Sequence, residues 1–430
     1  MREISNIPDK GRKKRIVIIG GGFAGLKVAR KLNTHRFQVV LLDKNNYHLF
    51  QPLLYQVATS GIGPSSISFP FRKVFRKKKN FHIRLCTAER VLPEKNIVET
   101  SIGCIDYDYL IIATGCETNY FGNSDLAYRT MALKTTPEAL YNRNRVLESF
   151  EKALNSPRFE DRKRLMTFVI VGAGATGIEL AGSMAEARKF VLHRDYPDLD
   201  INLMRIILID AGPRVLSAFS EKSSEDVQKH LEKLHVEILL NSTVKSYYNN
   251  ILTLEDGTEI TTANVFWVAG VKANSLLGFK ETDYGRGNRL KVDEFNRVIN
   301  YKNIFALGDT ALMSTADYPN GHPQVVQPAI QQASHLVKNI QNMEKGKFLE
   351  PFKYHNKGSM ATIGRNAAVL EIKNFRMSGF FAWVIWLFIH LMSILGVKNK
   401  LIVMLDWTWS YFTYDQSLRL LFKVQNRRQR

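Results

Sequence analysis

Residues 15–25, RIVIIGGGFAG, join a β-branched apolar run directly to a glycine-rich turn. The apolar run predicts a buried parallel strand, and a helical pattern then continues to about Leu32. A second apolar run, 37–42, ends in Asp43, which follows Gly20 at close to the spacing of about 20 residues seen in dinucleotide-binding units. This stretch therefore predicts a Rossmann-type βαβ unit near the start of the chain.

The same pattern returns in the middle of the chain. Residues 168–177, FVIVGAGATG, again place a strand before a glycine-rich turn, and the run 206–209 ends in Asp210. The residues between, roughly 186–203, predict an extended helix and loop. One glycine-rich turn is weak evidence, whereas two, each between a strand and a helix and each followed by an acid, are strong evidence for two dinucleotide sites.

Each glycine of such a turn is required for a different physical reason. The first allows the tight bend, the second lets backbone N–H groups approach a pyrophosphate, and the third allows close helix packing. The helix N-terminus adds about half a positive charge for the phosphates. Two nucleotides on one chain indicate a tightly held redox cofactor and an exchangeable one, and a flavin with a nicotinamide is the economical pair because hydride passes directly between them.

Composition narrows the class of protein. The 430 residues suggest two or three domains, and 45% hydrophobic with 23% charged residues is a globular composition. The net charge of +20 indicates an anionic partner, either lipid head groups or nucleic acid, but no nucleic-acid-binding motif accompanies it, so we expect no nucleic acid. The three cysteines form no CxxC pair, and no His/Cys spacing suggests a metal site.

Three further motifs resemble those of a known family. The stretches 46–58, NYHLFQPLLYQVA, and 176–182, TGIELAG, together with the glutamines of 326–333, VQPAIQQA, look like those of type II NADH:quinone oxidoreductases. These are single-subunit, non-proton-pumping, FAD-dependent NADH dehydrogenases. The resemblance runs from about residue 14 to the C-terminal tail.

The resemblance implies which loop holds which nucleotide. Non-covalent FAD would occupy the first loop, and its implied contacts are Gly20, Gly22, Phe23, Ala24, Gly25, Asp43, Lys44, Thr114, Gly115 and Asp309. NADH would occupy the second, and its implied contacts are Gly172, Gly174, Gly177, Asp210 and Gly270. A carboxylate at Asp210 favours NADH over NADPH because it accepts from the 2′-OH and repels a 2′-phosphate, although Arg214 softens that repulsion.

The resemblance also implies three catalytic residues, Glu179, Gln327 and Gln331. Glu179 would lie beside the flavin, where nicotinamide and quinone meet; alternatively it is a first-turn acid favoured by the helix dipole. The glutamines would share a helix face and bind the quinone carbonyls, or alternatively form an ordinary exposed face. Here the family motif is altered by Val326 and Pro328, and Pro328 predicts that the helix begins near Gln327.

The C-terminal part is apolar and aromatic. Residues 377–397 lack Asp, Glu, Lys and Arg, and as a helix they would be roughly 30 Å long. Residues 401–414 are rich in Trp and Tyr, which favour the membrane interface, although their alternation would also suit a strand. A buried core helix and a transmembrane span are possible, but we favour a helix in one leaflet followed by an interfacial segment. The basic runs at 72–79 and 425–430 then indicate anionic lipid.

These observations predict an α/β flavoprotein with two Rossmann-type dinucleotide-binding domains and a C-terminal membrane-binding helical region. We expect a FAD-binding domain split between 13–125 and 298–345, an NADH-binding domain at 126–297, and an interface and membrane-anchoring region at 346–430. The start of the chain has no apolar signal region and no transit-like pattern. We therefore expect attachment to the cytoplasmic face of a bacterial cytoplasmic (inner) membrane, with a homodimer possible.

The expected activity is oxidation of NADH through bound FAD with two-electron reduction of a membrane quinone, ubiquinone or menaquinone. Proton pumping is not expected, because one apolar segment offers no transmembrane proton path. Two alternatives remain open at this point. One is a reductase of the same architecture that passes electrons to a protein such as ferredoxin, and the other is an NADH-sensing flavoprotein with negligible turnover.

Overall fold

The structure is a computed structural model that describes residues 2–415 and 418–421, so the basic run at 425–430 lies outside the described residues. The chain forms two compact units. Unit 1 consists of the chain up to Leu49, Ser68–Glu117 and Val271–Lys357. Unit 2 consists of Phe50–Ile67, Thr118–Gly270 and the described residues from Gly358 onward.

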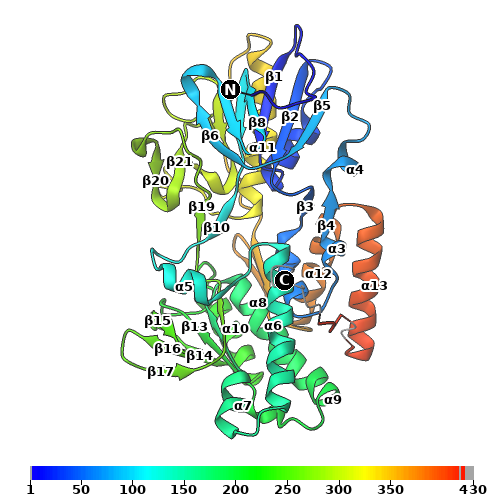
Figure 1. Cartoon of the computed structure of the whole chain (residues 1–430), viewed down its shortest axis with the longest axis vertical. Helices are drawn as coiled ribbons and strands as arrows, with labels where there is room; N and C mark the ends of the chain where they lie inside the picture. Colours follow the sequence, from blue (N-terminus) through cyan, green and yellow to red (C-terminus); the bar gives the residue numbers. More distant parts are fainter. Residues whose placement is uncertain (1, 416–417, 422–430) are drawn as a thin grey trace, which may run out of the picture. The chain divides into compact units, whose positions relative to one another are not determined.

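Unit 1 is built on a five-stranded parallel sheet (Figure 1). Its strands, in spatial order, are β22 (Ile304–Ala306), β9 (Tyr109–Ile112), β1 (Lys14–Ile19), β2 (Phe37–Asp43) and β5 (Phe81–Leu85). Two helices, α1 (Phe23–Lys31) and α11 (Val326–Met343), pack side by side, with α1 against β1. The side chains that alternate to the other face of β1 and β2 are buried against the antiparallel sheet of β6 (Ala88–Leu92), β7 (Ile97–Thr100) and β8 (Gly103–Asp106).

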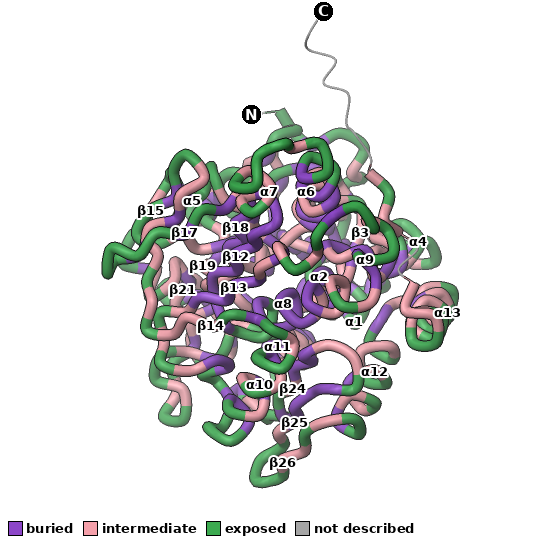
Figure 2. Tube along the Cα trace, turned by 90° about the horizontal axis from the view of Figure 1, so that it is seen from below, coloured by how far each residue is buried: buried purple, intermediate pink, exposed green. Residues whose placement is uncertain are grey.

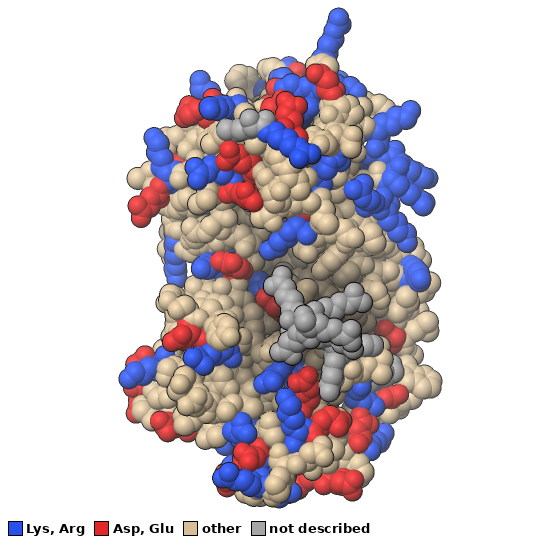
Figure 3. Space-filling view, in the orientation of Figure 1, with Lys and Arg blue, Asp and Glu red and all other residues tan. Residues whose placement is uncertain are grey.

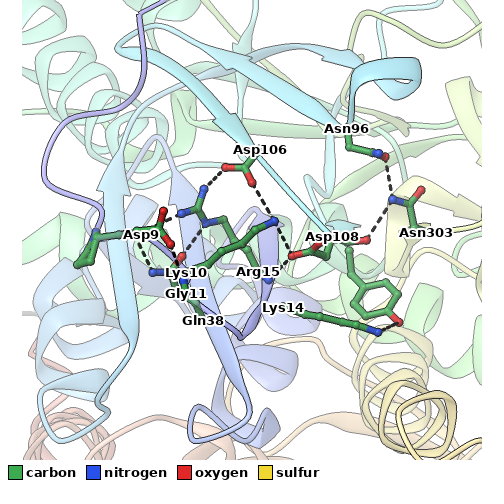
Figure 4. Close-up of polar contacts among 12 residues, drawn as sticks. Asp9, Lys10, Gly11, Lys14, Arg15, Gln38, Asn96, Asp106, Asp108 and Asn303 are labelled. Carbon is green, nitrogen blue, oxygen red and sulfur yellow. Dashed lines mark hydrogen bonds and ion pairs between the residues drawn. The ribbon is translucent and has the colours of Figure 1, made fainter.

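A polar network fixes the start of β1 (Figure 4). The Arg15 backbone N–H donates to Asp108 at 2.7 Å, and its side chain donates to Gln38 at 2.6 Å and pairs with Asp106. Lys10 Nζ adds a 2.9 Å hydrogen bond to Asp108. These partners offset the cost of burying the Arg15 charge at the start of the apolar strand β1.

Unit 2 repeats the design of unit 1. Its parallel sheet consists of β11 (Met131–Ala132), β18 (Asn264–Trp267), β12 (Thr167–Val171), β13 (Arg205–Ile209) and β14 (Glu237–Leu239). A meander of β15 (Val244–Tyr248), β16 (Ile251–Leu254) and β17 (Glu259–Thr261) buries one face. Helix α8 (Ala175–Ala187) packs on the sheet and continues into a π-helical turn, Arg188–Leu192, as the predicted extended helix requires.

The single apolar helix expected over 377–397 is wrong, because this stretch is divided between the end of a strand, one helix and the start of a second helix. An antiparallel sheet of β24 (Ser359–Thr362), β25 (Ala368–Ile372) and β26 (Phe375–Ser378) leads into α12 (Phe380–Ser393) and then α13 (Val397–Thr413). Gly379 and Gly396, with φ of +86° and +81°, separate these elements. The aromatic segment is therefore helical, and the alternative of a strand there is wrong.

Both terminal helices leave much apolar surface uncovered. Figure 2 shows buried residues where β24 ends and β25 begins, whereas α12 and α13 are mostly exposed or half-buried. Helix α12 buries Ala382 and Trp386 against this sheet, and α13 buries Val403. Among the described residues, no helix combines the length and the hydropathy that crossing a membrane would require.

Candidate functional site

Both glycine-rich turns have the geometry that a dinucleotide site needs. The first glycine of each has a positive φ, +96° at Gly20 and +110° at Gly172, which L side chains rarely adopt. A Cβ at the third glycine, Gly25 or Gly177, would lie 1.8 Å from the carbonyl oxygen of the first. Only glycine therefore fits at these positions, because the helix passes so close to the strand end.

The second glycine of each turn is different, because it faces open space. A Cβ on Gly22 or Gly174 would meet no atom within 4 Å. This is the position at which backbone N–H groups must approach a pyrophosphate, and the helices α1 and α8 begin immediately after it. Phe23 and Ala24 form the first turn of α1, as a phosphate-binding helix start requires. The residues present thus fit a dinucleotide in both units.

The acid after the second strand of each unit contacts its own turn. Asp43 Oδ2 accepts a 2.6 Å hydrogen bond from the Gly21 backbone N–H, and burial raises the pKa of this carboxyl. Asp210 Oδ2 accepts an equivalent 2.6 Å bond from Ala173. Each carboxylate oxygen has two acceptor sites, so these bonds leave capacity for ribose hydroxyls. Lys44, next to the first acid, is exposed.

The remaining FAD candidates of unit 1 converge on one turn. Gly115 N–H donates to Thr310 Oγ1 at 3.1 Å, and Thr114 Oγ1 lies 3.1 Å from the same oxygen. Asp309 accepts a 2.9 Å hydrogen bond from the Cys116 thiol. The structure therefore brings Thr114, Gly115 and Asp309 together, although they come from distant parts of the chain.

The NADH candidate Gly270 follows β18 at the end of the unit 2 sheet. A Cβ there would lie 3.2 Å from the ring of Phe121, a residue with φ of +51°. The glycine therefore keeps this strand end open beside an exposed aromatic ring. Arg214 turns its guanidinium to the Ser217 carbonyl at 3.1 Å rather than pairing with Asp210.

Glu179 is a buried carboxyl with a strongly raised pKa. It lies just beyond the first turn of α8, not within it as expected, because the helix begins at Ala175, ahead of Gly177. Only 9% of the residue is exposed, and burial raises its pKa to about 8, although a backbone hydrogen bond from Thr362 lowers it in part. At neutral pH the carboxyl is therefore mostly protonated and can donate a hydrogen bond.

This carboxyl lines a cavity of unit 2 that has a volume of about 520 Å³. The walls come from α2 (Leu54–Ala58), α8, the β24–β25 turn, α12 and α13. The polar residues that line it include Tyr55, Gln56, Glu179, Ser183, Glu186 and Arg365. Most other lining residues are apolar or aromatic, so the cavity has the size and character of a site for an apolar ligand with a few polar groups.

The two glutamines of α11 hold a neighbouring segment of unit 1. Gln331 exchanges two hydrogen bonds with the His355 backbone, at 2.9 and 3.0 Å, and Gln327 Oε1 accepts from the Lys357 N–H at 3.0 Å. The helix begins at Val326, one residue before the expected start. The structure thus gives both amides a local role, which neither the exposed-face alternative nor the quinone hypothesis anticipated.

Several residues of these sites were missed from the sequence. Gln332, next to Gln331, is buried and accepts a 2.7 Å hydrogen bond from the Gly308 N–H, so it supports the turn that carries Asp309. His48 was not missed, because it lies in the motif 46–58 and was considered for the flavin pocket or a structural role; its Nδ1 lies 3.1 Å from the Gly21 carbonyl oxygen. The residues of α2 and α13 lie in stretches that the sequence singled out, 46–58 and 401–414, but nothing local showed that they form one cavity wall, because they are far apart in the chain.

Comparisons with known proteins agree with this geometry. The family model for pyridine nucleotide-disulphide oxidoreductases matches residues 14–333, and the model for the NDH2 C-terminal domain matches 356–413. A protein of Mycobacterium tuberculosis named type II NADH:quinone oxidoreductase Ndh is 38% identical over 94% of this chain and 89% of its own length. A second protein of that organism, named type II NADH:quinone oxidoreductase NdhA, is 36% identical over 93% of this chain and 88% of its own length.

A solved structure supports the fold independently. The NDH2 of Plasmodium falciparum, solved in complex with NADH, has a TM-score of 0.88 and 21% identity, and the match covers 96% of this chain and all of that one. At this identity the likeness shows the fold alone. Together with the sequence relatives and the two family models, it shows that the chain belongs to the type II NADH:quinone oxidoreductase family.

Proposed function

We propose that this protein oxidises NADH through bound FAD and reduces a membrane quinone with two electrons, without pumping protons. The observation that carries the proposal is the cavity of about 520 Å³ that Glu179 lines, within a chain whose relatives are named NADH:quinone oxidoreductases. The NDH2 C-terminal model also covers the segment that supplies most of the apolar wall. This favours a quinone over a protein such as ferredoxin as the electron acceptor.

The two units divide the nucleotides between them in this proposal. The turn at Gly20–Gly25, with Asp43 and Asp309, holds FAD in unit 1, and the turn at Gly172–Gly177, with Asp210, holds NADH in unit 2. FAD held there would supply the redox chemistry, as acceptor of hydride from NADH and donor of two electrons to quinone. The protein binds and orients the reactants, and no side-chain nucleophile is needed.

The cavity of unit 2 is the proposed quinone site. Its aromatic and apolar wall suits a quinone ring and the start of an isoprenoid tail, and the neutral Glu179 carboxyl donates a hydrogen bond to a quinone oxygen. Apart from this cavity, we also propose Gln327 and Gln331, on α11 of unit 1, as quinone contacts. The Gln331 amide has a second N–H in addition to the one that His355 accepts.

Attachment to a membrane rests on the two terminal helices. Large apolar side chains are exposed on α12 and α13; they include Phe380, Phe381, Phe388, Leu401, Leu405 and Phe412. Such a surface suits helices that lie in one leaflet and receive the quinone from the lipid. On unit 1, Lys and Arg gather around α4 (Phe71–Phe75), where Arg72, Lys73, Arg76, Lys77 and Lys79 are exposed (Figure 3). We propose that this basic patch binds anionic lipid at the cytoplasmic face.

Steady-state kinetics with two acceptors tests the function. The purified protein should oxidise NADH at a rate that saturates with a short-chain quinone and is negligible with oxidised ferredoxin. Faster NADH oxidation with ferredoxin than with quinone would favour the protein-acceptor alternative. Flavin reduction by NADH without turnover on either acceptor would favour the sensing alternative.

A further inference from the structure

A chain of hydrogen bonds runs along one wall of the unit 2 cavity. The indole Nε1 of Trp407, on α13, donates to Gln56 Oε1 at 2.8 Å. The Gln56 amide Nε2 donates to the Tyr55 hydroxyl oxygen at 3.0 Å. All three residues line the cavity, and Tyr55 is almost fully buried. The chain therefore connects the exposed terminal helix with a buried hydroxyl inside the cavity.

The chemistry of the three groups fixes the direction of these bonds. An indole N–H can only donate, so the group of Gln56 that faces Trp407 must be the carbonyl oxygen. This fixes the orientation of the amide, which is otherwise ambiguous, and places its NH₂ group against Tyr55. The Tyr55 oxygen is therefore the acceptor in that bond, and its own proton is left to donate elsewhere.

The surroundings of Tyr55 suit a donor that never ionises. Burial raises the pKa of this phenol well above its usual 10, and the charge of nearby Glu179 raises it further. The hydroxyl thus keeps its proton at every physiological pH. The Glu179 and Glu186 carboxyls, whose charges act on this hydroxyl, also line the cavity, and a ligand carbonyl that enters it would be a further acceptor.

We propose that the Tyr55 hydroxyl donates a hydrogen bond to a quinone carbonyl, and that Trp407 and Gln56 orient it for this purpose. The inference rests on the proposed function, because it assigns a residue to the quinone site of that reaction. Tyr55 contacts the substrate, whereas Gln56 and Trp407 act through it as positioning residues. Because Trp407 belongs to α13, the seating of this helix determines whether the donor is oriented.

Anaerobic rapid-mixing kinetics of the two half-reactions tests this inference. In the Tyr55→Phe variant, reduction of the flavin by NADH should proceed at the wild-type rate, since no quinone takes part. Reoxidation by a short-chain quinone should be slower by about threefold to tenfold, which corresponds to one lost neutral hydrogen bond. Reoxidation by ferricyanide, which accepts electrons without a carbonyl, should not change.

The Trp407→Phe variant tests the positioning role. It keeps an aromatic ring but frees the Gln56 amide to turn its oxygen toward Tyr55. The Tyr55 hydroxyl would then donate its hydrogen bond to Gln56 instead of to the quinone. Quinone reoxidation should slow by about twofold to threefold in this variant, and by nothing more when Trp407→Phe is added to Tyr55→Phe. If the double variant slows quinone reoxidation by the product of the two single-variant factors, the proposed chain of hydrogen bonds is overturned.

A matched control separates this role from general damage to the fold. Tyr247 is also buried in unit 2, and its hydroxyl donates to the Thr262 carbonyl at 3.0 Å, but it does not line the cavity. Tyr247→Phe should leave quinone reoxidation unchanged. A wild-type protein that quinone fails to reoxidise overturns the proposed function, and this inference with it. Normal wild-type reoxidation with an equally fast Tyr55→Phe variant overturns this inference alone.

Discussion

Asp43 and Asp210 make the same pair of hydrogen bonds in their respective units. Each carboxylate accepts a 2.6 Å hydrogen bond from the backbone N–H of the second residue of its glycine-rich turn, Gly21 or Ala173. Each also accepts from the backbone N–H two residues after the acid itself, at 2.6 Å for Asp43 and 2.7 Å for Asp210. One carboxylate thus fixes each glycine-rich turn and keeps acceptor sites for the proposed ribose contacts. Under the proposed function, this duplication would let one chain bind two dinucleotides by the same physical means.

The first prediction concerns the second of these acids. Asp210→Asn keeps the size of the side chain and one acceptor oxygen but removes the charge. The kcat/KM for NADH should fall by about tenfold, because a charge-assisted hydrogen bond contributes roughly 1.5–3 kcal/mol, and the preference for NADH over NADPH should narrow. Steady-state kinetics with both nucleotides measures this change.

An exposed acid of the same unit provides the control. Asp256 lies in the turn between β16 and β17 and accepts a hydrogen bond from Thr258. Asp256→Asn should leave kcat/KM unchanged for both NADH and NADPH. Asp43→Asn, in unit 1, should instead lower the FAD content of the purified protein. An Asp210→Asn variant with wild-type selectivity between NADH and NADPH would show that NADH does not use this acid.

The second prediction follows from the raised pKa of Glu179. The folded protein releases this proton near pH 8, whereas the unfolded chain releases it near pH 4.5. Between these values the unfolded state binds fewer protons, so this group lowers the free energy of unfolding as pH rises. Glu179→Gln removes this pH-dependent fall in the free energy of unfolding. The variant should be more stable than wild type at pH 8, by on the order of a few kcal/mol, with little difference near pH 4.

Chemical unfolding at several pH values measures this difference. Activity provides a second test, because in the proposed quinone site only the protonated Glu179 carboxyl can donate a hydrogen bond to quinone. Reoxidation by quinone should slow as pH rises through about 8 in the wild type, and should lose this dependence in Glu179→Gln. Parallel stability curves for the two proteins across pH would contradict a buried, neutral Glu179.

The third prediction concerns Arg365, which holds the end of α13. Its guanidinium donates to the carbonyl oxygens of Ser410 at 2.9 Å and Tyr411 at 3.0 Å, and it lies 4.0 Å from the ring centroid of Tyr414. The last carbonyls of a helix have no partner within the helix, so Arg365 acts as a C-terminal cap. Arg365→Ala should destabilise the last turn of α13 by about 1–2 kcal/mol.

Hydrogen–deuterium exchange read peptide by peptide measures this local effect. Exchange should become faster in the last turn of α13 and stay unchanged in the sheets of unit 2. Arg376→Ala is the matched control, because this arginine donates to Ser223 and to the Lys222 carbonyl on a different helix, α10 (Glu221–Lys233). Equal exchange at the end of α13 in all three proteins would rule out the capping role.

The fourth prediction tests membrane attachment. Phe381 and Phe388 on α12 are 71% and 64% exposed, and Phe412 on α13 is 76% exposed. Replacing all three by serine should weaken binding to anionic vesicles by at least tenfold, since each buried aromatic ring contributes about 1.5–3 kcal/mol. Phe348, in unit 1, is 98% exposed but lies outside α12 and α13. Phe348→Ser should bind vesicles like the wild type, and equal losses in both variants would contradict the assignment of the terminal helices.

The sequence predicted the features whose causes lie within a few residues. Gly20 and Gly172 could be recognised because only glycine tolerates the bend, and the strands before them because their apolar runs are long enough to be buried. The split of the C-terminal segment also had a local signal. Gly379 and Gly396 adopt positive φ and end the elements before them, but the uncharged composition around them concealed this.

The cavity could not be predicted in the same way. Its wall joins Tyr55 and Gln56 of α2 with Trp407, more than three hundred residues later in the chain, and no spacing rule connects them. Glu179 was identified from a motif, but its raised pKa comes from burial among other segments. The hydrogen bonds of Gln331 to His355 were equally hidden, since only the folded chain brings the second segment to α11.

An anaerobic visible spectrum of the purified protein follows both proposed half-reactions in one sample. NADH is added first, and a short-chain quinone follows. We expect the flavin absorption band to be lost with NADH and to return rapidly with quinone. The absence of a flavin band would contradict the proposed function. A reduced flavin that quinone does not reoxidise would contradict it as well.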